Sequence, residues 1–242
     1  MKEHKKLKEH QKIPEKRWIF KMDDKFRSQV QKKGEYVEGF GYSHGPSAAI
    51  WRTMLEKSYV KRMNIALDLF DIPKYKNTTE YSETVVADVV CGPWGGISFV
   101  RRWPAMYLID PSWSVYEKEG VVKILSNKGS FFIEDYAQTF TLPEKANIIF
   151  SINTLNHGGD AKSSLDNIMK NLKDDGLFFL HLHMREKEEA DNGHPMPLYK
   201  ENLQELFNEY NIIQCNWLDG DPLKSMNGHK TVVATLRNKK EI

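Results

Sequence analysis

An apolar run that leads directly into a glycine-rich turn constrains the fold of this chain more than any other feature. Residues 85–90 are β-branched or otherwise apolar except for Asp88, a composition typical of a strand buried on both faces of a parallel sheet. Gly92, Gly95 and Gly96 follow, and glycine permits the tight backbone conformations that let N–H groups approach a ligand. The segment predicts a strand followed by a ligand-binding loop of the kind that holds nucleotides.

Strand and helix patterns alternate from residue 84 onward, which indicates a doubly wound α/β domain. Residues 218–229, between the last two expected strands, are rich in Asp, Gly, Pro and Asn and have no helical period, so these strands should pair antiparallel. We expect a seven-stranded, mostly parallel sheet with an antiparallel last strand. The expected strands are 84–90, 105–110, 130–134, 147–152, 176–182, 211–217 and 230–236, and the expected helices lie around 160–173 and 198–209.

The first 80 residues differ from the rest of the chain. They are charged and mostly helical in pattern, and the apolar positions of residues 48–70 follow a helical period that ends near Pro73. Residues 1–33 hold twelve Lys or Arg against five Asp or Glu, whereas the remainder has no basic stripe, so nucleic-acid binding is not favoured. We expect residues 1–80 to form a basic tail with a helical cap or lid, and residues 81–242 to form the ligand-binding domain.

The cysteines and the hydropathy pattern limit the cellular setting. Cys91 and Cys215 lie far apart, without the spacing of a disulfide framework or a metal site, which favours a reducing, cytoplasmic compartment. No apolar run approaches the roughly 18 residues that a membrane span needs. We therefore expect a cytoplasmic protein without a membrane span. We also expect it to be a monomer or a homodimer.

The ordered motifs of residues 84–237 resemble the class I S-adenosylmethionine-dependent methyltransferases. The resemblance implies a Rossmann-like methyltransferase fold, with S-adenosylmethionine as cofactor and S-adenosylhomocysteine as product. One departure lies in the first motif, where Val90 and Trp94 stand in place of the family's usual glycines, and we expect Gly95 to make the close approach instead. The matching segments are 88–96, 109–111, 134–137, 148–153 and 171–179.

The same resemblance assigns cofactor contacts to the ends of the strands. Asp88 would orient the loop and the amino-acid end of the cofactor, and Asp110, one βαβ unit later, would accept hydrogen bonds from the ribose hydroxyls. Asp135 or Glu134 would accept from the adenine amino group, and the sequence leaves open which of them does so. The cofactor-binding candidates are Asp88, Gly92, Trp94, Gly95, Asp110, Pro111, Trp113, Asp135, Tyr136 and Ser151.

A nicotinamide-dependent dehydrogenase is the main competing interpretation of a glycine turn with an acid downstream. The dehydrogenase fingerprint places its glycines as G-x-G-x-x-G, and the spacing of Gly92, Gly95 and Gly96 does not fit it. Asp88, moreover, precedes the glycines within the strand, which favours the methyl donor.

Methyl transfer requires alignment of acceptor and donor and, for a hydroxyl acceptor, removal of a proton. Histidine is the base best matched to neutral pH. His157, after the fourth strand, is the first candidate for general base, and His194 and His181 are further catalytic candidates, although His157 would serve equally well as a loop cap. His181 and His183 alternate along the fifth strand and should face the same side of the sheet. A divalent metal site built from these two histidines and nearby loop residues is not favoured, because the residues have no fixed ligand spacing. The loop residues that would complete such a site are His194, Asp219, Asp221 and His229.

The acceptor is the least constrained part of the prediction. Polar and aromatic residues of the cap and of the strand ends suit a hydroxyl-rich ligand, so a sugar, glycan or other small polar hydroxyl acceptor is the leading hypothesis. N-methylation of a small amine, or RNA methylation assisted by the basic tail, remains an alternative. The substrate-binding candidates are Tyr42, His44, Asn153, His183 and His229.

Overall fold

The computed structural model describes residues 61, 63–70, 83–92, 97, 103–114, 130–155, 160–184, 198–223 and 226–239, with the backbone alone described at 221 and 226–229. The basic tail and most of the expected cap lie outside these residues. So do six predicted site residues, and the side chain of His229 lies outside them as well. The six residues are Tyr42, His44, Trp94, Gly95, His157 and His194.

In the described part of the chain, no helix combines the length and the apolar character needed to cross a bilayer.

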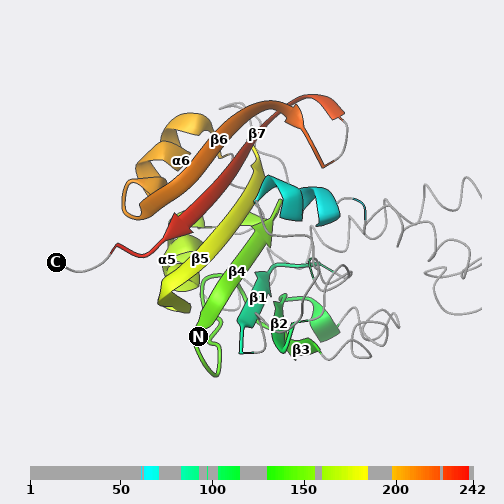
Figure 1. The fold of residues 1–242 in the computed structure, drawn as a ribbon, viewed down its shortest axis with the longest axis vertical. Helices are drawn as coiled ribbons and strands as arrows, with labels where there is room; N and C mark the ends of the chain where they lie inside the picture. Colours follow the sequence, from blue (N-terminus) through cyan, green and yellow to red (C-terminus); the bar gives the residue numbers. More distant parts are fainter. Residues whose placement is uncertain are drawn as a thin grey trace, which may run out of the picture.

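The described residues form one sheet with helices on both faces (Figure 1). Two helices, α5 (Ala161–Lys170) and α6 (Lys200–Phe207), connect strands of the sheet. The strands are β1 (Val85–Val89), β2 (Ala105–Ile109), β3 (Ser130–Ile133), β4 (Ala146–Ile152), β5 (Leu172–His183), β6 (Asn211–Asp221) and β7 (Met226–Arg237).

The order of the strands confirms the fold predicted from the sequence. The seven strands lie in the order β3-β2-β1-β4-β5-β7-β6. β1 to β5 pair in parallel, whereas β7 lies antiparallel between β5 and β6. This is a doubly wound, mostly parallel sheet with an antiparallel last strand, the Rossmann-like arrangement of methyltransferases.

The first four strands agree with the predicted bounds to within one residue at each end, but β5 and β7 begin earlier than expected. β5 begins at Leu172 rather than at 176, because Leu172 pairs with Ala146 on β4 and a register shift follows at Ile148. The polar residues between Leu172 and Gly176 give no strand signal of their own. Tertiary pairing therefore extends β5 beyond what local sequence indicates.

The two faces of the sheet bury different sets of side chains, because successive residues of a strand point to opposite faces. On one face, Ala87 and Ile149 pack against Leu165 of α5 and Phe207 of α6. On the other face, Val86, Leu108, Phe150 and Phe179 pack against the helical segment 63–69, drawn in cyan in Figure 1. That segment is helical, as the apolar period of residues 48–70 predicts.

The parallel strands share one functional edge. Ligands of open α/β sheets bind outside the carboxyl ends of the strands, where the chain changes direction. The carboxyl ends of β1 to β5 lie at the same edge, which therefore gathers Asp88, Asp110, Asp135, Asn153 and His183.

Candidate functional site

The loop after β1 begins with two residues in the left-handed region. Val90 has φ of 55° and Gly92 has φ of 67°. Val90 donates its N–H to Ile109 O on β2 over 2.7 Å, which holds it in this conformation. The valine thus takes up a conformation that glycine adopts freely, at the position where the resembling family usually has glycine. Among the described residues, no heavy atom beyond the chain neighbours of Gly92 lies within 4 Å of the place a Cβ would take, so these residues leave the space beside its backbone open.

Asp88 closes the base of this loop. Its side chain is 1% exposed, and its Oδ2 accepts a hydrogen bond from Ile97 N over 2.8 Å. Burial raises the pKa of Asp88 to about 7; the hydrogen bond from Ile97 opposes the rise, and the charge of Asp110 adds to it. The bond joins the two ends of the glycine-rich loop, which fits the loop-orienting role expected of Asp88.

Asp110 joins the ends of β1 and β2. Its Oδ2 accepts from Gly92 N and its Oδ1 accepts from Ser112 N, each over 2.9 Å, and the residue is fully buried. Both oxygens of this carboxylate therefore accept hydrogen bonds from backbone N–H groups. Pro111 is buried in the turn that follows.

Trp113 is buried at the end of β2, with 4% of the residue exposed. Its indole N–H donates to Leu108 O over 2.9 Å, and its ring packs edge-on against Phe132 with centroids 4.8 Å apart. The side chain is therefore part of the core beneath the site, and its expected contact with the cofactor remains a prediction.

The acids after β3 differ in their surroundings. Asp135 is half-buried, and its Oδ1 accepts from Tyr136 N and from Thr139 Oγ1. Glu134 is exposed and accepts from Ser114 Oγ over 2.7 Å. Tyr136 is 1% exposed. Its burial and, to a smaller extent, the negative charge of Asp135 raise the pKa of its hydroxyl. Asp135 is thus the more enclosed of the two acids.

A hydrogen-bonded brace joins the end of β4 to the end of β1. Ser151 Oγ lies 2.9 Å from Thr154 Oγ1, and Thr154 Oγ1 donates to Val89 O over 3.2 Å. Ser151 is 1% exposed, so its side chain is buried at this end of β4. The brace fixes the loop after β4 relative to the glycine-rich loop.

Asn153 joins the same loop to β5. It is a left-handed residue with φ of 58°, its N–H donates to His181 O over 2.6 Å, and its Oδ1 accepts from His183 N over 3.3 Å. His181 is 1% exposed, whereas His183 is half-buried. The two rings lie on the same face of β5, as predicted, with centroids 5.5 Å apart.

Sequence reasoning singled out most of the acids and histidines of this edge but missed Ser112 and Thr154. Ser112 follows Asp110 by two residues, which was the one available signal for it. Thr154 carries no sequence signal, because its partner Val89 lies 65 residues earlier. Among the described residues, no three His, Cys, Asp or Glu side chains lie together in a metal-binding arrangement.

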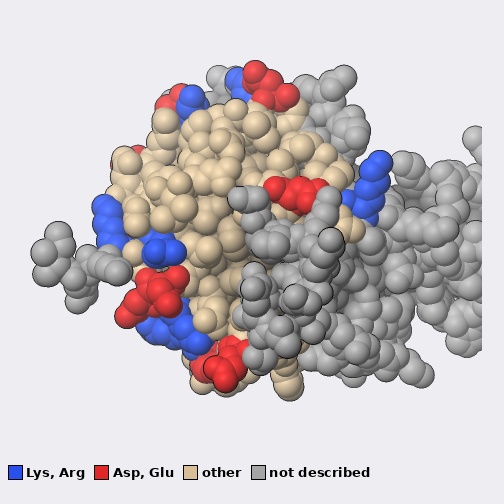
Figure 2. All heavy atoms as spheres, viewed as in Figure 1, with Lys and Arg blue, Asp and Glu red and all other residues tan. Residues whose placement is uncertain are grey.

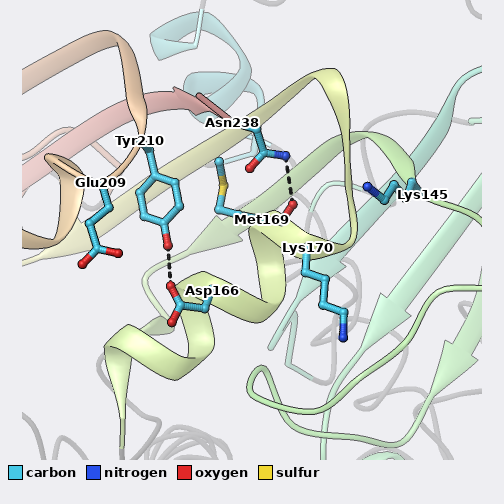
Figure 3. A pocket seen from close by; sticks show the side chains of 7 residues that line it. All are labelled: Lys145, Asp166, Met169, Lys170, Glu209, Tyr210 and Asn238. Atoms are coloured by element: carbon cyan, nitrogen blue, oxygen red, sulfur yellow. Dashed lines mark hydrogen bonds between the residues drawn. The ribbon is translucent and has the colours of Figure 1, made fainter. Parts of the chain in front are cut away.

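A separate groove lies at the opposite edge of the sheet. It has a volume of about 540 Å³ and lies beside the ends of α5, α6 and β7 (Figure 3). Asp166 within it is bonded to Tyr210 Oη, and Asn238 donates to Met169 O. Lys145 and Asn238 mark the amino edge, since Lys145 precedes β4 and Asn238 follows the antiparallel β7. The groove contains none of the predicted site residues.

Charge on the described surface is mixed. In Figure 2, Lys and Arg side chains lie next to Asp and Glu side chains around the rim of the visible face. Lys162, for example, pairs with both Asp166 and Glu209. The described part of this face has no continuous basic stripe of the kind that follows a nucleic-acid backbone.

Comparison with solved structures identifies the fold. The N-methyltransferase NodS from Bradyrhizobium japonicum, solved with S-adenosyl-L-homocysteine, aligns over 89% of this chain and 99% of its own, with 11% identity and a TM-score of 0.53. The 1,6-didemethyltoxoflavin-N1-methyltransferase of Burkholderia thailandensis aligns over 80% and 89%, with 15% identity and a TM-score of 0.52. The [4+2]-cyclase SpnF aligns over 76% and 94%, with 12% identity and a TM-score of 0.51. A scan against protein-family models and a comparison with curated protein sequences each give no match.

Proposed function

We propose that this chain, whose fold is that of the class I S-adenosylmethionine-dependent methyltransferases, binds S-adenosylmethionine at the carboxyl ends of β1 to β3 and methylates a small polar acceptor. The observation that carries the proposal is the joint geometry of Gly92 and Asp110. Gly92 is left-handed and open on its Cβ side, and its N–H is held by the buried Asp110 carboxylate. A fold alone does not fix a reaction, so the proposal rests on this site.

The residues at this edge fit the chemistry of the cofactor. Adenosine presents ribose hydroxyls and an exocyclic amine as hydrogen-bond donors, and carboxylates accept from both. In this proposal Asp110 holds the ribose and Asp135, the more enclosed of the two acids after β3, holds the adenine amine, while Asp88 keeps the loop closed through its hydrogen bond from Ile97 N. When bound, the cofactor supplies an activated methyl group.

On the acceptor side, we propose O-methylation of a hydroxyl, with a sugar or glycan as the leading acceptor class. His183 is half-buried at the end of β5, and its backbone is held by Asn153. A histidine in that position suits removal of a proton from an acceptor hydroxyl as the methyl group is transferred. His157, the first candidate from the sequence, and His194 and His181 stay candidates for the same task on the basis of the sequence.

N-methylation is the second candidate. Both methyltransferases compared above are N-methyltransferases by name, one of them acting on 1,6-didemethyltoxoflavin. A neutral amine attacks without prior loss of a proton, so this reaction needs no strong base. The pH dependence of turnover distinguishes the two, because an amine acceptor gives a rise that follows the pKa of the amine itself.

Calorimetric titration with S-adenosylhomocysteine tests the cofactor part of the proposal. We expect saturable binding to the full chain and a loss of at least tenfold in affinity for Asp110→Ala, since a carboxylate hydrogen bond contributes about 1.5–3 kcal/mol. Asp174→Asn is the matched control, because Asp174 is an acid at the amino edge with a side chain 94% exposed. Absence of binding, or equal losses in both variants, would refute the proposed site.

A further inference from the structure

The Ser112 hydroxyl is a buried polar group at the carboxyl end of β2. Ser112 is 2% exposed, and its Oγ has no partner among the described residues. Its backbone N–H, by contrast, is bonded to Asp110 Oδ1. Burying a hydroxyl without a hydrogen bond costs free energy, and alanine at this position would avoid the cost. The hydroxyl is therefore a destabilising group in the ligand-free protein.

This hydroxyl belongs to the same cluster as the open glycine. The two oxygens of Asp110 hold the backbone N–H groups of Ser112 and Gly92, one on each oxygen. Ser112, Asp110 and Gly92 are thus joined at the carboxyl ends of β1 and β2, and the space beside Gly92 is open. A serine hydroxyl turns among three staggered positions and both donates and accepts, so it suits a ligand that carries hydroxyl groups.

We propose that Ser112 is a further cofactor-binding residue, whose hydroxyl forms a hydrogen bond to a ribose hydroxyl of S-adenosylmethionine beside the Asp110 carboxylate. The proposal rests on the function proposed above. It accounts for a buried hydroxyl that the ligand-free fold leaves unsatisfied, because the missing partner arrives with the ligand.

The proposal predicts opposite effects on stability and on binding. Ser112→Ala should leave the melting temperature of the ligand-free protein unchanged or raise it, since the variant removes an unsatisfied buried group. The same variant should weaken S-adenosylhomocysteine binding by about threefold to tenfold, the value of one neutral hydrogen bond. Ser112→Cys replaces the hydroxyl by a slightly larger thiol, which is a weak donor, and its affinity should lie between those of the wild type and Ser112→Ala.

Ser164→Ala is the matched control. Ser164 is also fully buried, but its hydroxyl donates to Asp160 O over 2.7 Å on α5, away from the carboxyl edge of β1 and β2. Its alanine variant should lower the melting temperature and leave S-adenosylhomocysteine affinity unchanged.

Titration of wild type and Ser112→Ala with S-adenosylhomocysteine and with its 2′-deoxy and 3′-deoxy analogues completes the test. We expect the difference between the two proteins to disappear for the analogue that lacks the hydroxyl bound by Ser112, as in a double-mutant cycle. Equal affinity of the two proteins for S-adenosylhomocysteine overturns the inference and leaves the proposed function intact. A difference that persists with both analogues overturns the ribose contact. No binding of S-adenosylhomocysteine to wild type means instead that the proposed function has failed.

Discussion

Replacement of Val90 by glycine and by alanine gives a direct test of the strained loop after β1. The left-handed conformation costs a residue with a Cβ about 1–2 kcal/mol, and glycine avoids this cost. Elsewhere in a strand, glycine is less stabilising than alanine by about 0.5–1 kcal/mol, because it loses more conformational freedom on folding. With φ of 55° at residue 90, the first effect exceeds the second. We therefore expect Val90→Gly to be more stable than Val90→Ala by about 0.5–1 kcal/mol.

Both variants should be less stable than the wild type. Val90 is 6% exposed and packs in the core cluster on the α5 face of the sheet. Removal of its methyl groups costs about 0.8 kcal/mol for each buried group. The informative quantity is therefore the difference between the two variants, in which this packing loss largely cancels.

Urea unfolding followed by tryptophan fluorescence measures that difference. Ala87→Gly is the control, because Ala87 lies in β1 with ordinary strand geometry and is fully buried. There glycine should reduce the free energy of unfolding relative to alanine, by about 0.5–1 kcal/mol or more. If Val90→Gly proves less stable than Val90→Ala, residue 90 is not held in the left-handed region and the argument about the loop is wrong.

Two further predictions concern Asp88 and Gly176. The pKa of the Asp88 carboxyl is raised to about 7 in the folded protein. Between about pH 4 and pH 7 the folded state therefore keeps the carboxyl proton, whereas the unfolded chain loses it. The free energy of unfolding should fall progressively over this range. Asp88→Asn keeps an acceptor for Ile97 N, and urea titrations at several pH values should show that it removes this part of the decline; parallel profiles for the two proteins would contradict the assignment. At Gly176, a Cβ would lie 2.8 Å from the Leu172 side chain and 3.0 Å from Asn147 O. Gly176→Ala should therefore lower the free energy of unfolding in urea by about 1–3 kcal/mol. An unchanged unfolding midpoint would show instead that β5 relaxes to accommodate the methyl group.

The sequence predicts the sheet well because each strand carries its own signal. The continuous apolar run around Asp88 indicates a strand buried on both faces, and β1 is buried at every position. The start of β5 could not be predicted, since Leu172 joins the sheet through pairing with Ala146 and not through local pattern. Extended pairing of this kind depends on a neighbour that is distant in sequence.

The same limit applies to the site. Acids at strand ends could be identified because a buried strand that ends in Asp110 is unusual in itself. The brace from Thr154 to Val89 and the unsatisfied hydroxyl of Ser112 could not be identified, because both are properties of contacts between segments. Trp113 is packed against Phe132 in the core, a contact between segments that the sequence does not indicate, and its expected contact with the cofactor remains a prediction.

The position of β7 between β5 and β6 bears on the order in which the domain is completed during synthesis. In the described sheet, β6 forms hydrogen bonds with β7 alone, and β7 follows β6 in the chain and so leaves the ribosome later. β6 therefore has no strand partner until residues 226–237 emerge and pair beside β5. If a ribosome stalls before this point, the edge of β5 that β7 covers and both edges of β6 stay unpaired, and unpaired strand edges are surfaces on which chains pair with one another and aggregate.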